Sequence, residues 1–367
     1  MSLRCPTCGA SYNDSARFCT RDGTALLPLA TGPAHGPGPQ ALQGALRAPD
    51  GGARVNVPVP KAELPAHATL AGQILDGRYL IERKLGEGGM SFVYLATEVA
   101  TGTRRAIKVL SPSLSQDATA MARLKREAAL AGKVRHPNVC HIECMGQTPT
   151  GLVYVVMPFL EGEILSDRTY RLGQLPIDEV VPLIVEIAAG LHAAHEEQVV
   201  HRDLKPENIM IVRGPDGRPH AVVMDFGLAK ERHAGPELER LTATGIVLGT
   251  PEFMSPEQLR GKPLDGRSDV YALALITVET LTGALPFSGK SQQELMLARL
   301  RNEPTPIRKL RPDLRFPVSV ERVLLKALAR NPSDRYPSAP EFAAALAAAT
   351  HPGSLGNTAQ VLKKWFG

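Results

Sequence analysis

The chain has 367 residues, more than one average domain, and 43% of them are hydrophobic, so it can bury a sizeable core. Its formal charge of +5 is a mild basic excess and weak evidence for nucleic-acid binding. Five cysteines, three of them within the first twenty residues, favour an N-terminal metal site over a disulfide framework. The start of the sequence carries no apolar leader, and uncharged apolar runs of about 18 residues are missing. The sequence therefore predicts a cytoplasmic protein without a membrane span.

Composition divides the chain into four parts. Residues 1–24 hold the cysteine cluster. Residues 25–72 are rich in Pro, Gly and Ala and contain too few apolar residues to offset the entropy of ordering, so they are expected to form a disordered linker. Dense periodicity over 79–348 predicts a globular domain, and 349–367 form a short tail.

The globular part begins with predicted strands. Short alternating or β-branched runs at 79–85, 92–97 and 104–109 are typical of strands, and the apolar spacing of 118–132 is typical of a helix. Another strand is expected at 153–159. These elements predict a small, strand-rich lobe.

The second half of the globular part is predicted to be mostly helical. Its clearest helix covers 178–196, with Asp178 as the expected N-cap. A strand-rich lobe followed by a helical lobe predicts an α+β, bilobal fold with a cleft between the lobes.

A glycine-rich stretch lies between the first two predicted strands. Glycines allow backbone N–H groups to approach phosphate oxygens where a Cβ would clash. The spacing is that of G-x-G-x-x-G with serine at the third glycine position, and a tight hairpin without a ligand is the plain alternative. The stretch comprises Leu85, Gly86, Glu87, Gly88, Gly89, Met90, Ser91, Phe92 and Val93.

A lysine on the next strand could act on the same phosphates. Lys108 ends the run Ala106-Ile-Lys, and Glu127 on the following predicted helix could hold its ammonium group in place. A strand lysine is more often a solvated charge, but the motifs further along the chain favour the phosphate role.

Three oxygen-bearing residues follow in order. Asp203 and Asn208 lie five apart in His-Arg-Asp-Leu-Lys-Pro-Glu-Asn (201–208), and Asp225 begins Asp-Phe-Gly. Phosphoryl transfer needs hard oxygen ligands for Mg²⁺, a carboxylate that orients the attacking hydroxyl, and cations against the developing charge. The sequence supplies all of these parts.

Together these motifs resemble those of the eukaryotic-type (Hanks-type) serine/threonine protein kinases of bacteria, over residues 79–345. The resemblance implies the bilobal kinase fold and transfer of the γ-phosphate of ATP to Ser/Thr hydroxyls of protein substrates, with ATP and Mg²⁺ or Mn²⁺ as cofactors. An alternative from another class is a pseudokinase scaffold acting through the N-terminal segments. The intact set of catalytic residues disfavours it.

The resemblance also implies roles for single residues. Asp203 would orient the acceptor hydroxyl, Lys205 would support the γ-phosphate, and Asn208 and Asp225 would bind Mg²⁺. Lys108 would contact the α- and β-phosphates and pair with Glu127. The residues implied to seat the adenine are Val93, Ala106, Met157, Pro158, Leu160 and Met210.

Further residues are implied to support or switch the site. Thr250 would bridge Asp203 and Lys205, as in kinases that act on Ser and Thr. Thr242 and Thr244 are candidate autophosphorylation sites, reached through a transient dimer, or else ordinary loop threonines. The residues with implied structural roles are Thr250, Glu257 (paired with Arg335) and Asp269.

The N-terminal cysteines resemble a zinc ribbon. Cys5-Pro-Thr-Cys8-Gly and Cys19-Thr-Arg-Asp22-Gly share one spacing, and a carboxylate can replace a thiolate on Zn²⁺. The alternatives are a Cys₃ site completed by water or His35 and a metal-free tip. A ribbon would serve contacts with a protein partner, since it lacks the basic stripe of a nucleic-acid reader.

Two further cysteines lie in the globular part. Cys140 and Cys144 flank His141 on a predicted strand, which could indicate a second metal site. Buried, unreactive strand cysteines are the favoured interpretation.

Overall fold

The structure is a computed structural model of the chain. It describes residues 3–4, 11–12, 27–28, 70–88, 91–111, 118–149, 151–214, 216–226 and 251–350. Several predicted site residues lie outside these ranges: Cys5, Cys8, Cys19, Asp22, His35, Gly89, Met90, Thr242, Thr244 and Thr250. The backbones of Gly88 and Glu127 are described, but the Glu127 side chain is not.

The chain divides into two compact units, Met1–Glu63 and Leu64–Gly367. In the first unit three short strands pair antiparallel in the order β2-β1-β3. They are β1 (Leu3–Arg4), β2 (Ser11–Tyr12) and β3 (Leu27–Pro28).

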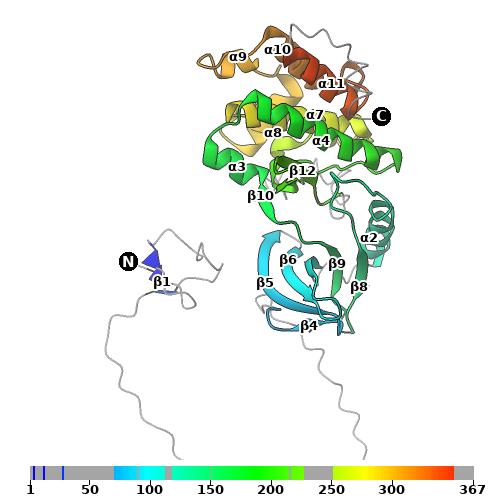
Figure 1. The fold of residues 1–367 in the computed structure, drawn as a ribbon. Coiled ribbons are helices and arrows are strands. Elements are labelled where there is room, and N and C mark those ends of the chain that lie inside the picture. The colour runs from blue at the N-terminus through cyan, green and yellow to red at the C-terminus, as the bar shows by residue number, and fades with distance from the viewer. Residues whose placement is uncertain are drawn as a thin grey trace, which may run out of the picture. The chain divides into compact units, whose positions relative to one another are not determined.

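The second unit begins with an antiparallel sheet in the order β4-β5-β6-β7-β9-β8, drawn in blue to green in Figure 1. The helix α2 (Ala118–Ala131) lies beside it. The strands are β4 (Ile74–Leu75), β5 (Tyr79–Gly88), β6 (Ser91–Glu98), β7 (Arg104–Leu110), β8 (Cys144–Gln147) and β9 (Val153–Pro158).

Apolar side chains at alternating strand positions pack together on one face of this sheet. Ile81, Ile107 and Val156 are fully buried there, and the rings of Tyr79 and Tyr154 meet edge to face with centroids 6.2 Å apart. Because successive strand residues point to opposite faces, this spacing fixes the register of the sheet.

A second sheet packs against helices of the large lobe. Its strands, in the order β10-β11-β12, are β10 (Gly162–Ile164), β11 (Ile209–Arg213) and β12 (Pro219–Val223). The helices of the large lobe are α3 (Leu165–Leu172), α4 (Ile177–Glu196), α6 (Pro256–Leu259), α7 (Gly266–Thr282), α8 (Gln292–Arg301), α9 (Ile307–Leu310), α10 (Val318–Ala327) and α11 (Ala339–Thr350). The single-turn helices are η1 (Pro206–Asn208), η3 (Pro251–Phe253) and η4 (Pro332–Asp334).

Helix α7 is the centre of the large lobe, with α4 and α11 packed against it (Figure 1). Nearly all of its side chains are buried, which is typical of a helix inside a core. Asp265 caps its first turn, and Gly283 ends it at a φ of 72°. A Cβ at Gly283 would lie 2.3 Å from the carbonyl oxygen of Gly173, so only glycine fits.

The predicted strands and helices are present with small shifts at their ends, but two details were wrong. Helix α4 has Pro176 as its N-cap residue, and Asp178 lies inside the first turn instead. Only Cys144 lies in a strand, because β8 begins there and Cys140 precedes it. None of the described helices is long and apolar enough to cross a membrane.

Candidate active site

The loop before β11 brings three predicted catalytic residues together. Asn208 Nδ2 donates to the carbonyl oxygen of Asp203 at 2.7 Å, which closes the loop around helix η1. Lys205 Nζ lies 3.9 Å from Asp203 Oδ2. The amide oxygen of Asn208 remains the atom of that side chain suited to a hard cation.

Asp225 follows β12 and meets a lysine from the other lobe. Lys108 Nζ, on β7, lies 2.8 Å from Asp225 Oδ1. Partial burial would raise the pKa of Asp225, but the charge and hydrogen bond of Lys108 outweigh it, and the pKa lies below its ordinary value. The carboxylate is therefore ionised at neutral pH and able to bind a metal ion.

The loop 201–208, called the catalytic loop below because it carries the predicted catalytic residues, is bonded to the segment that contains Asp225. His201 Nε2 lies 2.9 Å from the carbonyl oxygen of Met224, and Met224 N donates to the carbonyl of Asn208 at 2.8 Å. The His201 and Phe226 rings also pack with centroids 4.7 Å apart. These contacts hold Asp203, Asn208 and Asp225 in one group.

Asp269, on α7, forms hydrogen bonds with the backbone of the catalytic loop. Its carboxylate accepts from the backbone N–H groups of His201 at 2.9 Å and Arg202 at 3.1 Å. His195 Nε2 lies 2.7 Å from it. Burial would raise the pKa of Asp269, but the bond and charge of His195 hold it below its ordinary value.

The bond from Asp269 to Arg202 stabilises an unusual backbone conformation, which Asp225 shares. Arg202 and Asp225 have φ angles of 63° and 57°, in the left-handed region that side chains other than glycine rarely adopt. Such strain persists where the surroundings fix it, and it clusters at functional sites.

Gln258 is a site residue that the sequence did not reveal. Its Nε2 donates to the carbonyl oxygen of Arg202 at 2.6 Å. Its Oε1 accepts from the backbone of Ser255 at 2.8 Å, as half of a capping box on α6. The sequence signal for Gln258 was its position directly after Glu257, a residue with an implied structural role. That position does not indicate which group the side-chain NH₂ of Gln258 contacts.

The ion pair between Glu257 and Arg335 is buried and bidentate. Both oxygen–nitrogen distances are 2.7 Å, and Ser268 Oγ donates to the same carboxylate. Burial would raise the pKa of Glu257, but the hydrogen bond and charge of Arg335 lower it overall. Removing one partner would leave the other charge buried and unpaired. The free energy of unfolding would fall by about 3–5 kcal/mol.

The glycine-rich stretch forms a hairpin of β5 and β6. Gly86 pairs with Val93, Glu87 with Phe92, and the backbone of Gly88 with Ser91. Serine is thus placed directly opposite a glycine, and Leu85 is exposed on β5 of the hairpin.

The residues expected to seat adenine come from both lobes. Val93 and Ala106 are half-buried on the first sheet, Met157 and Pro158 end β9, and Leu160 follows it. Met210 is half-buried on β11.

The two cysteines of the globular part are free thiols. Burial raises the pKa of Cys140 to about 12, so it is an unreactive thiol at neutral pH. Cys144 is half-buried, 3.7 Å from the hydroxyl of Tyr79. Within the described residues, no three His, Cys, Asp or Glu side chains group as a metal site.

This architecture recurs in known proteins. Residues 79–346 match the model of the protein kinase domain family, so the chain belongs to the protein kinase family. Within it, the chain is similar to the serine/threonine-protein kinase pkn3 of Myxococcus xanthus, 38% identical over 277 residues. That match covers 76% of this chain and 51% of the relative, so the chain spans about half the relative's length.

Other relatives agree. The serine/threonine-protein kinase PrkC of Bacillus subtilis is 36% identical over 275 residues, which cover 75% of this chain and 41% of that protein. The crystal structure of the Mycobacterium tuberculosis PknI kinase domain superposes with a TM-score of 0.60 at 29% identity, covering 76% of this chain and 99% of that one.

Proposed function

We propose that the protein is a serine/threonine protein kinase that transfers the γ-phosphate of ATP to hydroxyl groups of protein substrates. The observation that carries this is the grouping of Lys108, Asp203, Asn208 and Asp225 from both lobes. Its relatives are named serine/threonine-protein kinases, which supports the choice of acceptor.

The proposed reaction moves one phosphoryl group. The acceptor oxygen bonds to the γ-phosphorus, the bond from that phosphorus to the β-phosphate oxygen breaks, and ADP leaves. Asp203 orients the acceptor hydroxyl and accepts its proton, and Lys205 offsets charge on the phosphoryl oxygens. When bound, Mg²⁺ neutralises phosphate charge, and the oxygens of Asn208 and Asp225 are the ligands that suit it.

The nucleotide would lie across the two lobes. When ATP binds, the ammonium group of Lys108 would give up part of its ion pair with Asp225. It would then contact the α- and β-phosphates and pair with Glu127. The β5–β6 hairpin would cover the phosphates, and adenine would lie among the half-buried apolar residues of β6, β7 and β11. Ser91 has a small side chain, so the hairpin could still cover the phosphates.

Phosphorylation of the segment before η3 would switch activity. A phosphate on Thr242 or Thr244 would add a double negative charge near Arg202, which precedes the catalytic Asp203. Thr250 would bridge Asp203 and Lys205. A transient dimer would allow one copy to phosphorylate another, and the ATP supply and free thiols favour a cytoplasmic site of action.

The N-terminal segment is proposed to bind zinc as a docking module for a protein partner. Strands β1 and β2 pair antiparallel, and the Cys5 and Cys8 positions lie between them in sequence, which suits a metal knuckle. Purified protein should contain one zinc per chain, and Cys5→Ser should lose it. Zinc-free wild-type protein with unchanged N-terminal folding would contradict the ribbon.

Phosphate incorporation from labelled ATP and Mg²⁺ tests the proposed activity. Wild-type protein should label Ser or Thr of itself and of a generic substrate, whereas Asp225→Ala should not. Absence of label in both, with ATP binding intact, would favour the pseudokinase scaffold.

A further inference from the structure

Basic residues concentrate in one stretch of the large lobe. Residues 308–326 contain six basic and two acidic side chains, an excess of four, whereas the formal charge of the whole chain is +5. The stretch covers most of helices α9 and α10 and the chain between them. Figure 1 shows both helices at the end of the large lobe away from the strand-rich lobe, so the charge lies apart from the candidate active site.

The outward side of α10 carries part of this charge. Residues four apart along a helix lie on the same face, and Val318, Arg322 and Lys326 repeat at that spacing. All three are exposed, whereas Val320 and Leu324 on the opposite side are buried. Val318, which is 48% exposed, therefore adds an apolar group to a basic helix face.

Helix α9 extends the same face. The backbone N–H of Arg308 donates to Glu321 Oε2 at 3.1 Å, so α9 lies beside α10. Arg308 and Lys309 are exposed, as is Arg315 between the two helices. We call the resulting surface the basic face; it consists of Arg308, Lys309, Arg315, Val318, Arg322 and Lys326.

Acidic side chains do not neutralise the basic face. Asp313 lies 2.7 Å from Arg311, and this pair carries no net charge. Glu321 is the other acidic residue of the stretch, against five exposed cations. In the part of the chain that the structure describes, none of these five forms an ion pair, and Lys326 Nζ instead lies 4.4 Å from the centre of the neutral Tyr336 ring.

The shape and chemistry of the basic face suit a lipid surface. The outward side of a helix is convex, so a broad anionic surface can contact several of its cations at once. Among the described residues of this stretch, no exposed aromatic side chain is present to stack on nucleic-acid bases. An exposed apolar residue among cations is typical of a protein surface that binds lipid headgroups.

The sequence after α11 favours the same partner. Residues 361–366 are Val-Leu-Lys-Lys-Trp-Phe, a mixture of apolar, aromatic and lysine side chains that suits the membrane–water interface. The end of α11 lies beside α10, since Ser319 Oγ donates to the carbonyl oxygen of Ala349 at 2.7 Å. The ten residues 351–360 can span at most about 33–36 Å, which is long enough for the aromatic pair to reach a membrane that α10 contacts.

We propose that the basic face binds the surface of a membrane that contains anionic phospholipids. Its cations lie against the charged headgroups, and Val318 lies at the boundary with the acyl chains. Because the face is apart from the active site, the bound protein keeps that site open to substrates. Membrane binding of this kind does not require phosphoryl transfer.

Co-sedimentation of the full chain with vesicles tests the basic face. Vesicles of phosphatidylcholine with about one third phosphatidylserine should bind the protein. Vesicles of phosphatidylcholine alone should bind it at least about tenfold more weakly. Binding to the anionic vesicles should weaken as salt rises, because the cations are exposed.

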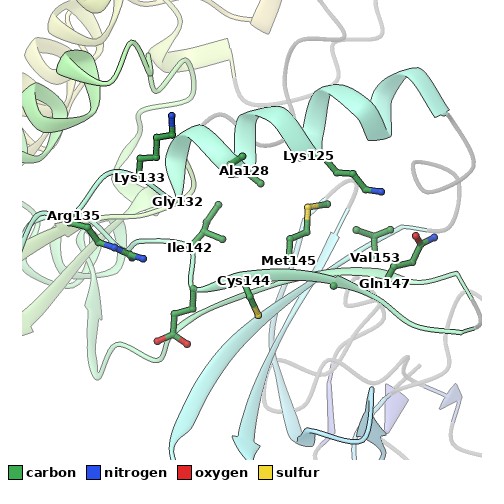
Figure 2. Close-up of a pocket in the computed structure, with 13 residues that line it drawn as sticks. Lys125, Ala128, Gly132, Lys133, Arg135, Ile142, Cys144, Met145, Gln147 and Val153 are labelled. Carbon is green, nitrogen blue, oxygen red and sulfur yellow. The ribbon is translucent and has the colours of Figure 1, made fainter.

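Variants locate the binding. Lys309→Glu with Arg322→Glu should weaken it by at least about tenfold, since each cation near an anionic surface contributes about a fivefold factor. The control, Lys125→Glu with Lys133→Glu, makes the same change in net charge at two exposed lysines of the other lobe (Figure 2). It should bind vesicles within about twofold of wild type. Val318→Ser should weaken binding by about twofold or more without a change in charge.

An absence of vesicle binding by wild type would overturn the proposal. So would equal binding by wild type and by Lys309→Glu with Arg322→Glu, or equal binding to vesicles with and without phosphatidylserine. A fluorescein-labelled DNA duplex is the second probe. Binding of the duplex without binding of vesicles would show that the basic face takes a nucleic acid, and would also overturn the proposal.

Discussion

Single hydrogen bonds fix the residues on which the proposed chemistry depends. The backbone of Arg202 has a positive φ, and it is held by Asp269 on one side and Gln258 on the other. Asp203 follows directly, so the position of its carboxylate depends on these bonds. Positioning of this kind accounts for a large part of catalysis by an enzyme with little covalent chemistry of its own.

The role of Gln258 can be separated from its helix cap. Gln258→Glu keeps an acceptor for the backbone N–H of Ser255 but loses the donor to the Arg202 carbonyl. We expect kcat to fall about tenfold or more, because the hydrogen bond is lost and the new carboxylate repels the Arg202 carbonyl oxygen, while the Kd for ATP changes little.

The control for this prediction is Gln292→Glu, at an exposed position that begins α8. Unchanged kcat in Gln258→Glu would show that the bond to Arg202 does not position the catalytic loop.

Glu279, on α7, should make stability depend on pH. Burial, together with the negative charges of Glu207 and Glu252, raises its pKa to about 7 from an ordinary value of 4.5. The folded state therefore favours the protonated carboxyl, and the free energy of unfolding should fall as pH rises from about 4.5 to about 7.

Glu279→Gln removes that dependence. At pH above about 7 it should stabilise the protein by about 1–3 kcal/mol, and thermal unfolding between acid and alkaline pH measures the effect. Glu197→Gln, at an exposed position, is the control. If the stability of Glu279→Gln and of wild type depended on pH in the same way, the raised pKa of Glu279 would be contradicted.

At the scale of elements, helix α7 organises the large lobe. Its buried carboxylate, Asp269, supports the catalytic loop, while Ser268 contacts the pair of Glu257 and Arg335. The helix therefore connects the core to the site, and its ends must be placed accurately.

The C-terminus of α7 offers a direct test. Gly283→Ala combines a positive φ with a Cβ 2.3 Å from a carbonyl oxygen, and should destabilise the protein by about 2–4 kcal/mol. Gly217→Ala has a φ of 77° with open space around it, and should cost only about 1–2 kcal/mol. Denaturant unfolding measures both, and equal losses would mean that the close contact with Gly173 is relieved without cost.

Elements with strong periodicity were predictable from the sequence, and short ones were not. The strands at 79–88, 91–98 and 104–110 follow from alternation, whereas β4 and β8 are too short to show a period. The N-cap of α4 was placed wrongly because Pro176 fixes the entry of the helix before Asp178 can cap it.

The grouping of Asp203, Asn208 and Asp225 in space was predictable, because their motifs resemble those of protein kinases. The pairing of Lys108 with Asp225 and the contact of Gln258 with Arg202 were not, because both depend on how distant segments pack.

At the scale of the whole molecule, the central claim is that the two lobes bring Lys108 and Asp225 together beside Asp203 for phosphoryl transfer. On this claim chemistry and nucleotide binding are separable, since Asp203 would act on the acceptor hydroxyl and Lys108 on ATP. A variant of Asp203 should therefore lose turnover while it retains the nucleotide.

The most direct measurement is single-turnover transfer from ATP to a generic protein substrate by wild type and Asp203→Asn, with ATP affinity measured in parallel. We predict a rate lower by about 10³-fold in Asp203→Asn, with the Kd for ATP unchanged within about twofold. Equal rates for the two proteins would contradict the account, because the proposed base would then have no part in the transfer.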